Sequence, residues 1–254
     1  MNSGVSQVSA KRAGVAVLVA LCGLLVGSPG ENAARVHAVD SRVSQHQAVL
    51  VPSAARFSTS GKQVIVVSAP RNRTTHARLR AYQRGAGGWR QVMNVTARIG
   101  ANGLVAGNKR RQGSNMTPTG MFPITQSFGV AANPGTSMPF SRVGPDHYWV
   151  GDNASPFYNE MRLGSEGGFK RKLSERMISY MPDYKYGAVI DFNRPNPIRG
   201  RGFAIFLHAN GGGATAGCVS IGVKKMKSLL RWLDPAKSPT IVIGRASWLK
   251  GPSR

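Results

Sequence analysis

The chain has 254 residues, of which 34 are Lys or Arg and 10 are Asp or Glu, giving a formal net charge of +24. An apolar share of 41% suffices to bury one core, which excludes an acidic disordered chain, and the length predicts one domain with a short appendage rather than two full domains. With 31 Gly and 15 Pro, the composition favours strands and turns over a long helical array.

The N-terminus has the pattern of a secretory signal peptide. Lys11 and Arg12 precede an uncharged stretch at residues 13–27, which is shorter than the ~20 apolar residues of a membrane span. Small residues before Ala38 predict cleavage there, so residues 1–38 are interpreted as a signal peptide, with an uncleaved membrane anchor as the alternative. We therefore expect a secreted protein whose basic residues attract anionic cell-wall polymers or lipid head groups rather than nucleic acid.

The rest of the chain divides by pattern into three parts. Residues 39–61 lack sustained periodicity and are predicted to be a linker or leader, residues 62–245 form one domain, and residues 246–254 form a C-terminal tail. The first three predicted strands are expected to form a meander. Runs of β-branched or alternating residues predict strands at 63–69, 77–83, 89–99, 121–125, 147–151, 187–192, 202–209 and 240–244.

A helix is predicted between the last two strands. Met226, Leu229 and Leu230 recur at three- and four-residue spacing with lysines on the opposite face, and Asp234-Pro235 ends the pattern. Helical character is weak at residues 172–180. Together these patterns predict a mainly β fold with one or two short helices.

Removal of the leader takes away Cys22, so the exported chain keeps one cysteine, Cys218. A lone cysteine in an oxidising compartment is either a small buried apolar residue or a reactive group, and the count alone leaves both interpretations open. His208 ends an apolar run at residues 203–208, and a glycine-rich loop leads from it to Cys218, so the two side chains can meet. A neighbouring imidazole would lower the pKa of the thiol and hold the thiolate as an ion pair.

The small residues before Cys218 suit an oxyanion hole made of backbone. Ala216 and Gly217 allow the main-chain N–H groups of residues 216–218 to turn toward an attacked carbonyl oxygen. Thr215 and Ser220, which flank this turn, are candidate substrate contacts. His147, Trp149 and Asp152 are further candidates, because they lie on a predicted strand and turn that could line a cleft, although an aromatic-rich strand is also typical of a core.

The segment 208–220, with Thr-Pro-Thr-Gly at 117–120 and His-Tyr-Trp-Val-Gly-Asp at 147–152, resembles the YkuD family of bacterial L,D-transpeptidases over about residues 62–245. The chain departs from the common family pattern because Ala216 replaces a second His and Ser220 replaces Arg or Asn. These features resemble a branch of the family that carries Thr-Ala-Gly-Cys.

The resemblance implies a YkuD-like β-sandwich in which Cys218 is the nucleophile and His208 the general acid and base. It implies that the main-chain carbonyl of Ala209 orients His208, and the side chain of Asn210 is the alternative. No metal or organic cofactor is expected, since the five His residues form no spaced ligand cluster with carboxylates or Cys.

The implied activity is acyl transfer on peptidoglycan stem peptides. The Cys218 thiolate would attack the carbonyl of the third, diamino-acid residue of a tetrapeptide, His208 would protonate the departing D-alanine, and an amine of a second stem would release the thioester as a crosslink. An L,D-carboxypeptidase activity at the same site and a non-catalytic basic cell-wall binding module stay open as alternatives. A secreted thiol peptidase would want a longer groove and further disulfides, which the sequence does not show.

Overall fold

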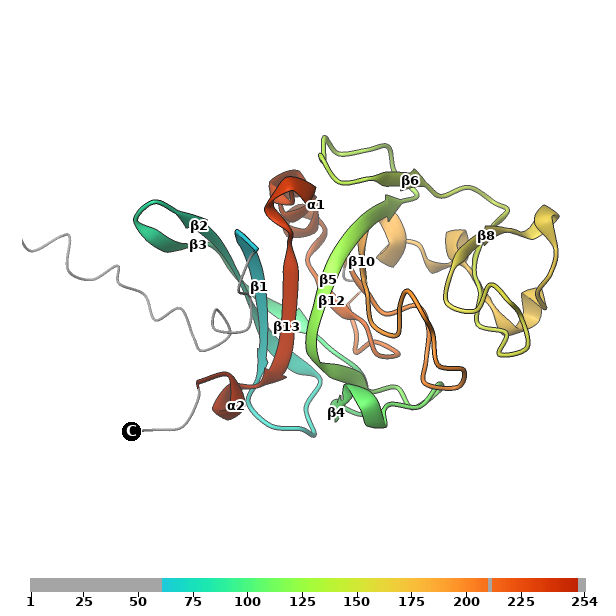
Figure 1. Ribbon diagram of the computed structural model, residues 1–254, viewed down its shortest axis with the longest axis horizontal. Helices are drawn as coiled ribbons and strands as arrows, with labels where there is room; N and C mark the ends of the chain where they lie inside the picture. The colour runs from blue at the N-terminus through green and yellow to red at the C-terminus, as the bar shows by residue number, and fades with distance from the viewer. Residues whose placement is uncertain (1–60, 210–211, 251–254) are drawn as a thin grey trace, which may run out of the picture. The chain divides into compact units, whose positions relative to one another are not determined.

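The computed structural model describes residues 61–209 and 212–250 (Figure 1). All of these residues belong to one compact unit, formed by residues 48–254. The predicted signal peptide and all but the last residue of the predicted linker lie outside the described residues, so both stay predictions. No helix in the described segments is long and apolar enough to cross a membrane.

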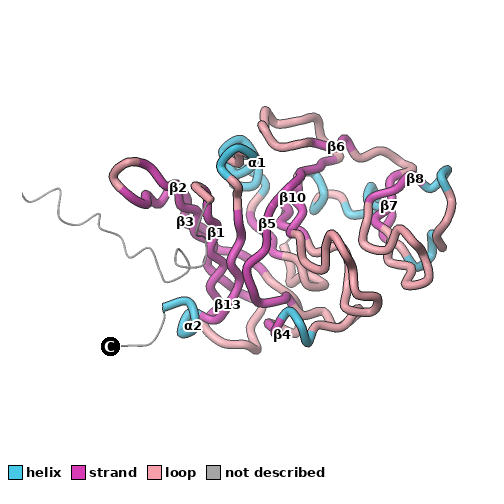
Figure 2. Tube along the Cα trace, viewed as in Figure 1, coloured by secondary structure: helices cyan, strands magenta, loops and turns pink. Residues whose placement is uncertain are grey.

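Strands dominate the domain, which confirms the mainly β class, and two α-helices follow near its C-terminal end (Figure 2). The helices are α1 (Val223–Trp232) and α2 (Ala246–Lys250). The strands are β1 (Gln63–Ala69), β2 (His76–Gly85), β3 (Gly88–Arg98), β4 (Leu104–Ala106), β5 (Thr117–Gly129), β6 (Phe140–Arg142), β7 (His147–Trp149), β8 (Met161–Leu163), β9 (Glu175–Arg176), β10 (Gly187–Ile190), β11 (Phe206–Ala209), β12 (Val219–Ile221) and β13 (Thr240–Arg245).

The main sheet closes on itself. Its strand order is β10-β11-β12-β3-β2-β1-β13-β5-β4, with β6 beside β5, and β10 also pairs with β5 in antiparallel orientation. Strands β1, β2 and β3 form the predicted antiparallel meander, while β13 returns parallel to β1. The ring is weakest between β12 and β3, where a single residue pair, Ser220 and Arg98, joins the two strands.

Alternation along the strands divides the side chains between two cores. In β11, Leu207 and Ala209 belong to the core that also contains the apolar face of α1, whereas Phe206 belongs to a second core on the other face of the strand. The buried residues of α1 are Met226, Leu229 and Leu230, as its predicted periodicity requires. Two packed faces on one strand agree with the predicted sandwich.

The second core is covered by residues 144–186, a segment of short strands and 3-10 turns that connects β6 to β10 (Figure 2). Its three-stranded sheet has the order β8-β7-β9. Phe206 packs edge-on against Trp149 at 4.7 Å and Tyr184 at 5.5 Å between ring centroids. This aromatic packing places the segment over one face of β11, and that face carries the site described below.

The structure differs from the sequence-based expectation in three places. β5 begins at Thr117, so the Thr-Pro-Thr-Gly motif lies inside a long strand. The predicted strand 202–209 forms only from Phe206, because Gly202 and Ala204 adopt φ values of +125° and +52°, which no strand accommodates. The predicted tail begins with α2, whose Leu249 is buried against the outer face of β1 and β13.

We predict that Leu229→Ala lowers the free energy of unfolding by about 2–5 kcal/mol, because Leu229 is fully buried under α1 and its truncation leaves a cavity. Urea denaturation measures the change. The matched control is Lys225→Ala on the exposed face of the same helix, which should change stability by no more than about 0.5 kcal/mol. Similar losses for the two variants would contradict this placement of α1.

Candidate functional site

Strand register places Cys218 and His208 on one face of the main sheet. β11 and β12 are parallel, with Leu207 opposite Val219 and His208 opposite Ser220. Because cross-strand partners share a face and alternate residues return to it, His208 lies on the same face as Cys218, the residue just before β12. The sequence-based expectation that these two residues can meet agrees with this register.

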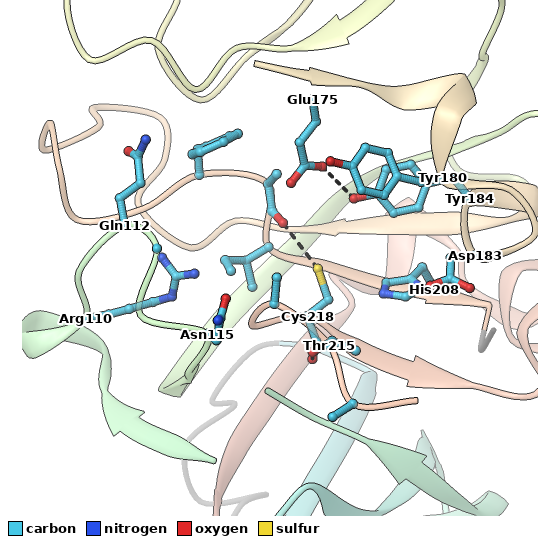
Figure 3. A pocket seen from close by; sticks show the side chains of 16 residues that line it. Arg110, Gln112, Asn115, Glu175, Tyr180, Asp183, Tyr184, His208, Thr215 and Cys218 are labelled. Carbon is cyan, nitrogen blue, oxygen red and sulfur yellow. Dashed lines mark hydrogen bonds between the residues drawn. The ribbon is translucent and has the colours of Figure 1, made fainter. Parts of the chain in front are cut away.

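Both side chains line a pocket of about 340 Å³ between the main sheet and the covering segment (Figure 3). Cys218 is only 7% exposed, yet its sulfur faces this space. Thr215 and Ala216 line the same pocket, and both belong to the turn that precedes Cys218. The lining is completed by Arg110, Gln112, Gly113, Asn115, Glu175, Tyr180, Asp183, Tyr184, Phe203, Ala204, Ile205 and Ala214.

Two threonine hydroxyls hold the turn at Cys218. Thr215 Oγ1 donates to the carbonyl oxygen of Cys218 at 2.7 Å, and Thr117 Oγ1 donates to the same oxygen at 3.3 Å. Thr215 Oγ1 also accepts from the N–H of Gly217 at 3.1 Å. That N–H is therefore occupied, and of the predicted oxyanion donors the N–H groups of Ala216 and Cys218 are left for a ligand.

The thiol is protonated in this state. Sγ of Cys218 donates to the carbonyl oxygen of Ala204 at 3.2 Å and receives the N–H of Phe206 at 3.4 Å. Burial, with the negative charge of Glu175 second, raises the pKa of the Cys218 thiol to about 12. The expected thiolate–imidazole ion pair is thus wrong for the resting protein, because a desolvated thiolate beside a carboxylate is too costly.

His208 is buried and held by backbone. Its Nδ1 lies 2.5 Å from the carbonyl oxygen of Ala209, the group that the family resemblance implied. Burial lowers the pKa of His208, while the Ala209 carbonyl and the charge and main chain of Asp183 act in the opposite direction. A neutral imidazole with Nδ1–H directed at a carbonyl leaves Nε2 as a proton acceptor. The alternative orienting group, Asn210, lies outside the described residues.

Four predicted substrate contacts do not line the pocket. Trp149 is fully buried and donates from Nε1 to Asn159 Oδ1 at 2.9 Å, and His147 Nδ1 accepts from the N–H of Gly144. Asp152 accepts from the N–H groups of Ala154 and Lys170, and these hydrogen bonds lower the pKa of its carboxyl. Ser220 is buried in β12. We retain these residues as structural groups rather than as substrate contacts.

The charged residues of the pocket were missed from the sequence. Arg110 was interpreted as part of a solvated basic run, yet it is 4% exposed between exposed neighbours. Glu175, Asp183 and Tyr184 come from the covering segment, where the sequence pattern was ambiguous. Their only sequence signal was composition, since acidic residues are scarce in a chain with 10 Asp and Glu among 254 residues.

Within the described parts of the chain, no group of three or more His, Cys, Asp and Glu side chains is placed to hold a metal ion. Residues 62–243 match the model of one protein family, YkuD, the L,D-transpeptidase catalytic domain. The matched residues run from the start of β1 into β13 and therefore include the closed sheet, the covering segment and the pocket. No curated protein matches the chain.

We predict that Gly217→Ala destabilises the fold by about 1–3 kcal/mol. Gly217 has φ +138°, and a Cβ there would lie 2.8 Å from Arg110 Nη2 and 2.9 Å from the carbonyl oxygen of Met116. Urea denaturation measures the effect. Gly213→Ala in the same loop is the control, because no atom lies within 4 Å of its added Cβ. A silent Gly217→Ala would mean that the turn relaxes without cost.

We predict that alkylation of Cys218 by iodoacetamide accelerates about tenfold per pH unit from pH 7 to pH 10, because only the thiolate reacts and the thiol pKa of about 12 lies above this range. Peptide mass spectrometry after timed quenching gives the rate. Glu175→Gln removes a negative charge that raises the thiol pKa, so it should speed alkylation at a given pH.

Glu160→Gln is the matched control for that effect, since Glu160 pairs with Arg162 and does not line the pocket. It should leave the alkylation rate unchanged. A rate that levels off near pH 8.5, the range of an unperturbed thiol, would contradict the protonated resting state.

Proposed function

The chain belongs to the L,D-transpeptidase catalytic domain family, which acts on peptidoglycan stem peptides, and we propose that it is an exported acyltransferase that crosslinks these stems through a thioester on Cys218. The observation that carries the proposal is the shared pocket of Cys218 and His208, which register brings to one face of β11 and β12. A packed relic cysteine would not need an opening beside an imidazole.

The first step follows from the protonation states. Because the thiol and the imidazole are both neutral at rest, proton transfer from Sγ to His208 accompanies attack on the carbonyl carbon of the third stem residue. The carbonyl oxygen becomes negative and is received by the N–H groups of Cys218 and Ala216, since the N–H of Gly217 is held by Thr215. Protonated His208 then gives its proton to the departing amine of D-alanine, and a thioester on Cys218 remains.

The second half uses the same groups in reverse. His208 takes a proton from the side-chain amine of a second stem, the amine attacks the thioester carbonyl, and the sulfur leaves as the thiol. The carbonyl of Ala204 is positioned to accept the S–H of the regenerated thiol. Water in place of the amine would give the L,D-carboxypeptidase product, so the acceptor decides the outcome.

Export and attraction to the cell wall complete the proposal. The basic n-region and apolar stretch within residues 1–38 support secretion, with a membrane anchor as the alternative. A net charge of +24 supports salt-sensitive attraction to anionic cell-wall polymers.

We predict that incubation with a purified tetrapeptide stem gives a protein adduct with the mass of the acyl tripeptide, and that Cys218→Ala abolishes both adduct and crosslinked dimer. His208→Ala should slow adduct formation by on the order of a hundredfold or more, because it removes the general acid and base. Intact-protein mass spectrometry and chromatography of the peptides provide the measurements.

The matched control is His76→Ala, because His76 is exposed on β2 and does not line the pocket. Its rate should equal that of the unmodified protein. Failure of the unmodified protein to form any adduct would favour the non-catalytic cell-wall module, and a tripeptide product without dimer would favour the carboxypeptidase.

A further inference from the structure

Two side chains of opposite charge face the pocket without pairing with each other. Arg110 enters from the segment between β4 and β5, and Glu175 enters from β9 in the covering segment (Figure 3). Among the described residues there are three ion pairs, and neither Arg110 nor Glu175 takes part in any of them. An unpaired buried charge is costly unless a ligand or solvent compensates it.

The fold holds Arg110 in a fixed position. Its Nε donates to the carbonyl oxygen of Met116 at 3.0 Å, and its Nη1 donates to the carbonyl oxygen of Arg201 at 3.2 Å. Gly202 makes room for this side chain, since a Cβ at Gly202 would lie 1.5 Å from Nη1. Nη2 has no hydrogen-bond partner in the described residues, so a guanidinium that is always charged keeps one edge for the pocket.

Glu175 is held in the same way by one of its two oxygens. Its Oε2 accepts the hydroxyl of Tyr184 at 2.7 Å, while Oε1 has no hydrogen-bond partner in the described part of the chain. The ring of Tyr184 packs on Phe206 and His208, which fixes the carboxylate relative to the catalytic strand. The pocket therefore presents one open anionic atom and one open cationic edge.

The position of these charges assigns them to the donor stem. His208 must reach the departing amine and then the attacking amine, so both of these groups occupy its side of the sulfur. Figure 3 shows Arg110 on the opposite side of Cys218 from His208, with Glu175 facing the same space. The part of the donor that stays attached to sulfur, including the side chain of its third residue, extends toward this side.

We propose that Arg110 and Glu175 form a specificity site for the side-chain end of the donor's diamino acid, which they recognise when it carries an amine and a carboxylate on one carbon. Nη2 of Arg110 receives the carboxylate, and Oε1 of Glu175 receives the amine. This inference rests on the proposed function. It also links recognition to activation, because an amine at Glu175 neutralises a charge that raises the pKa of Cys218.

Binding to the Cys218→Ala protein tests the site without any reaction. The probes are three tetrapeptide stems whose third residue is diaminopimelate, diaminopimelate amidated at its side-chain carboxyl, or lysine, each titrated by calorimetry. We expect the first to bind about tenfold or more tightly than the other two, because only it offers a carboxylate to Arg110. Equal affinity for the three stems would overturn the proposal.

Variants in the same background assign each charge. Glu175→Gln should weaken all three stems by a similar factor, because each carries the amine, and it should leave their order unchanged. Arg110→Gln should erase the preference for the carboxylate, while Arg111→Gln and Glu160→Gln, which lie outside the pocket, should change nothing. If loss of the Met116 and Arg201 contacts prevents Arg110→Gln from folding, the Glu175→Gln result and the comparison of stems still decide the question.

Failure of this proposal is distinguishable from failure of the proposed function. Stems that bind with the expected preference but never acylate the unmodified protein would leave the site standing and overturn the acyl transfer. Stems that acylate it with equal kcat/KM and bind equally would leave the acyl transfer standing and overturn the specificity site.

Discussion

The chemistry of this domain depends on the parallel pairing of β11 with β12. One residue of slip between them would turn either His208 or Cys218 into the apolar core that contains α1. The register is secured because Leu207 and Val219 fill that core while Phe206 fills the core on the other face. The same hydrophobic burial that stabilises the sheet therefore holds the two reactive side chains on one face.

The site keeps its nucleophile dormant by desolvation rather than by distance. Cys218 is closed in by the carbonyl of Ala204, whose φ of +52° is costly for a residue with a side chain. This strained segment also ends the regular strand at Phe206, so the carbonyl is free to meet sulfur instead of a neighbouring strand. A neutral thiol in an oxidising compartment reacts slowly with oxidants, because the thiolate is the reactive form.

Residues 144–186 turn a sheet face into a pocket with polarity. They cover the aromatic core around Phe206 and bring Glu175, Asp183 and Tyr184 close to the reactive pair. The opposite wall is supplied by Arg110 and by Thr215, which also holds the oxyanion turn. Substrate selection and thiol activation can therefore be changed in this segment without altering the closed sheet.

Local pattern was sufficient for the elements whose signal is local. The alternating or continuous apolar runs of β1, β2, β3 and β13 and the 3.6-residue period of α1 predicted these elements, and the spacing of His208, Gly217 and Cys218 predicted a thiol site. Short strands such as β4, β6, β8 and β9 carry too few residues to show a period.

The amino-acid sequence by itself determined the class of fold, the run of principal strands and the likeness of residues 208–220 to a catalytic motif. Only the tertiary structure decided that the thiol is protonated, that Gly217 N–H is already occupied, and that Arg110 and Glu175 face the nucleophile. Desolvation and charge proximity depend on residues far apart in the chain, since Glu175 and Arg110 lie in separate segments, and no local spacing encodes their meeting.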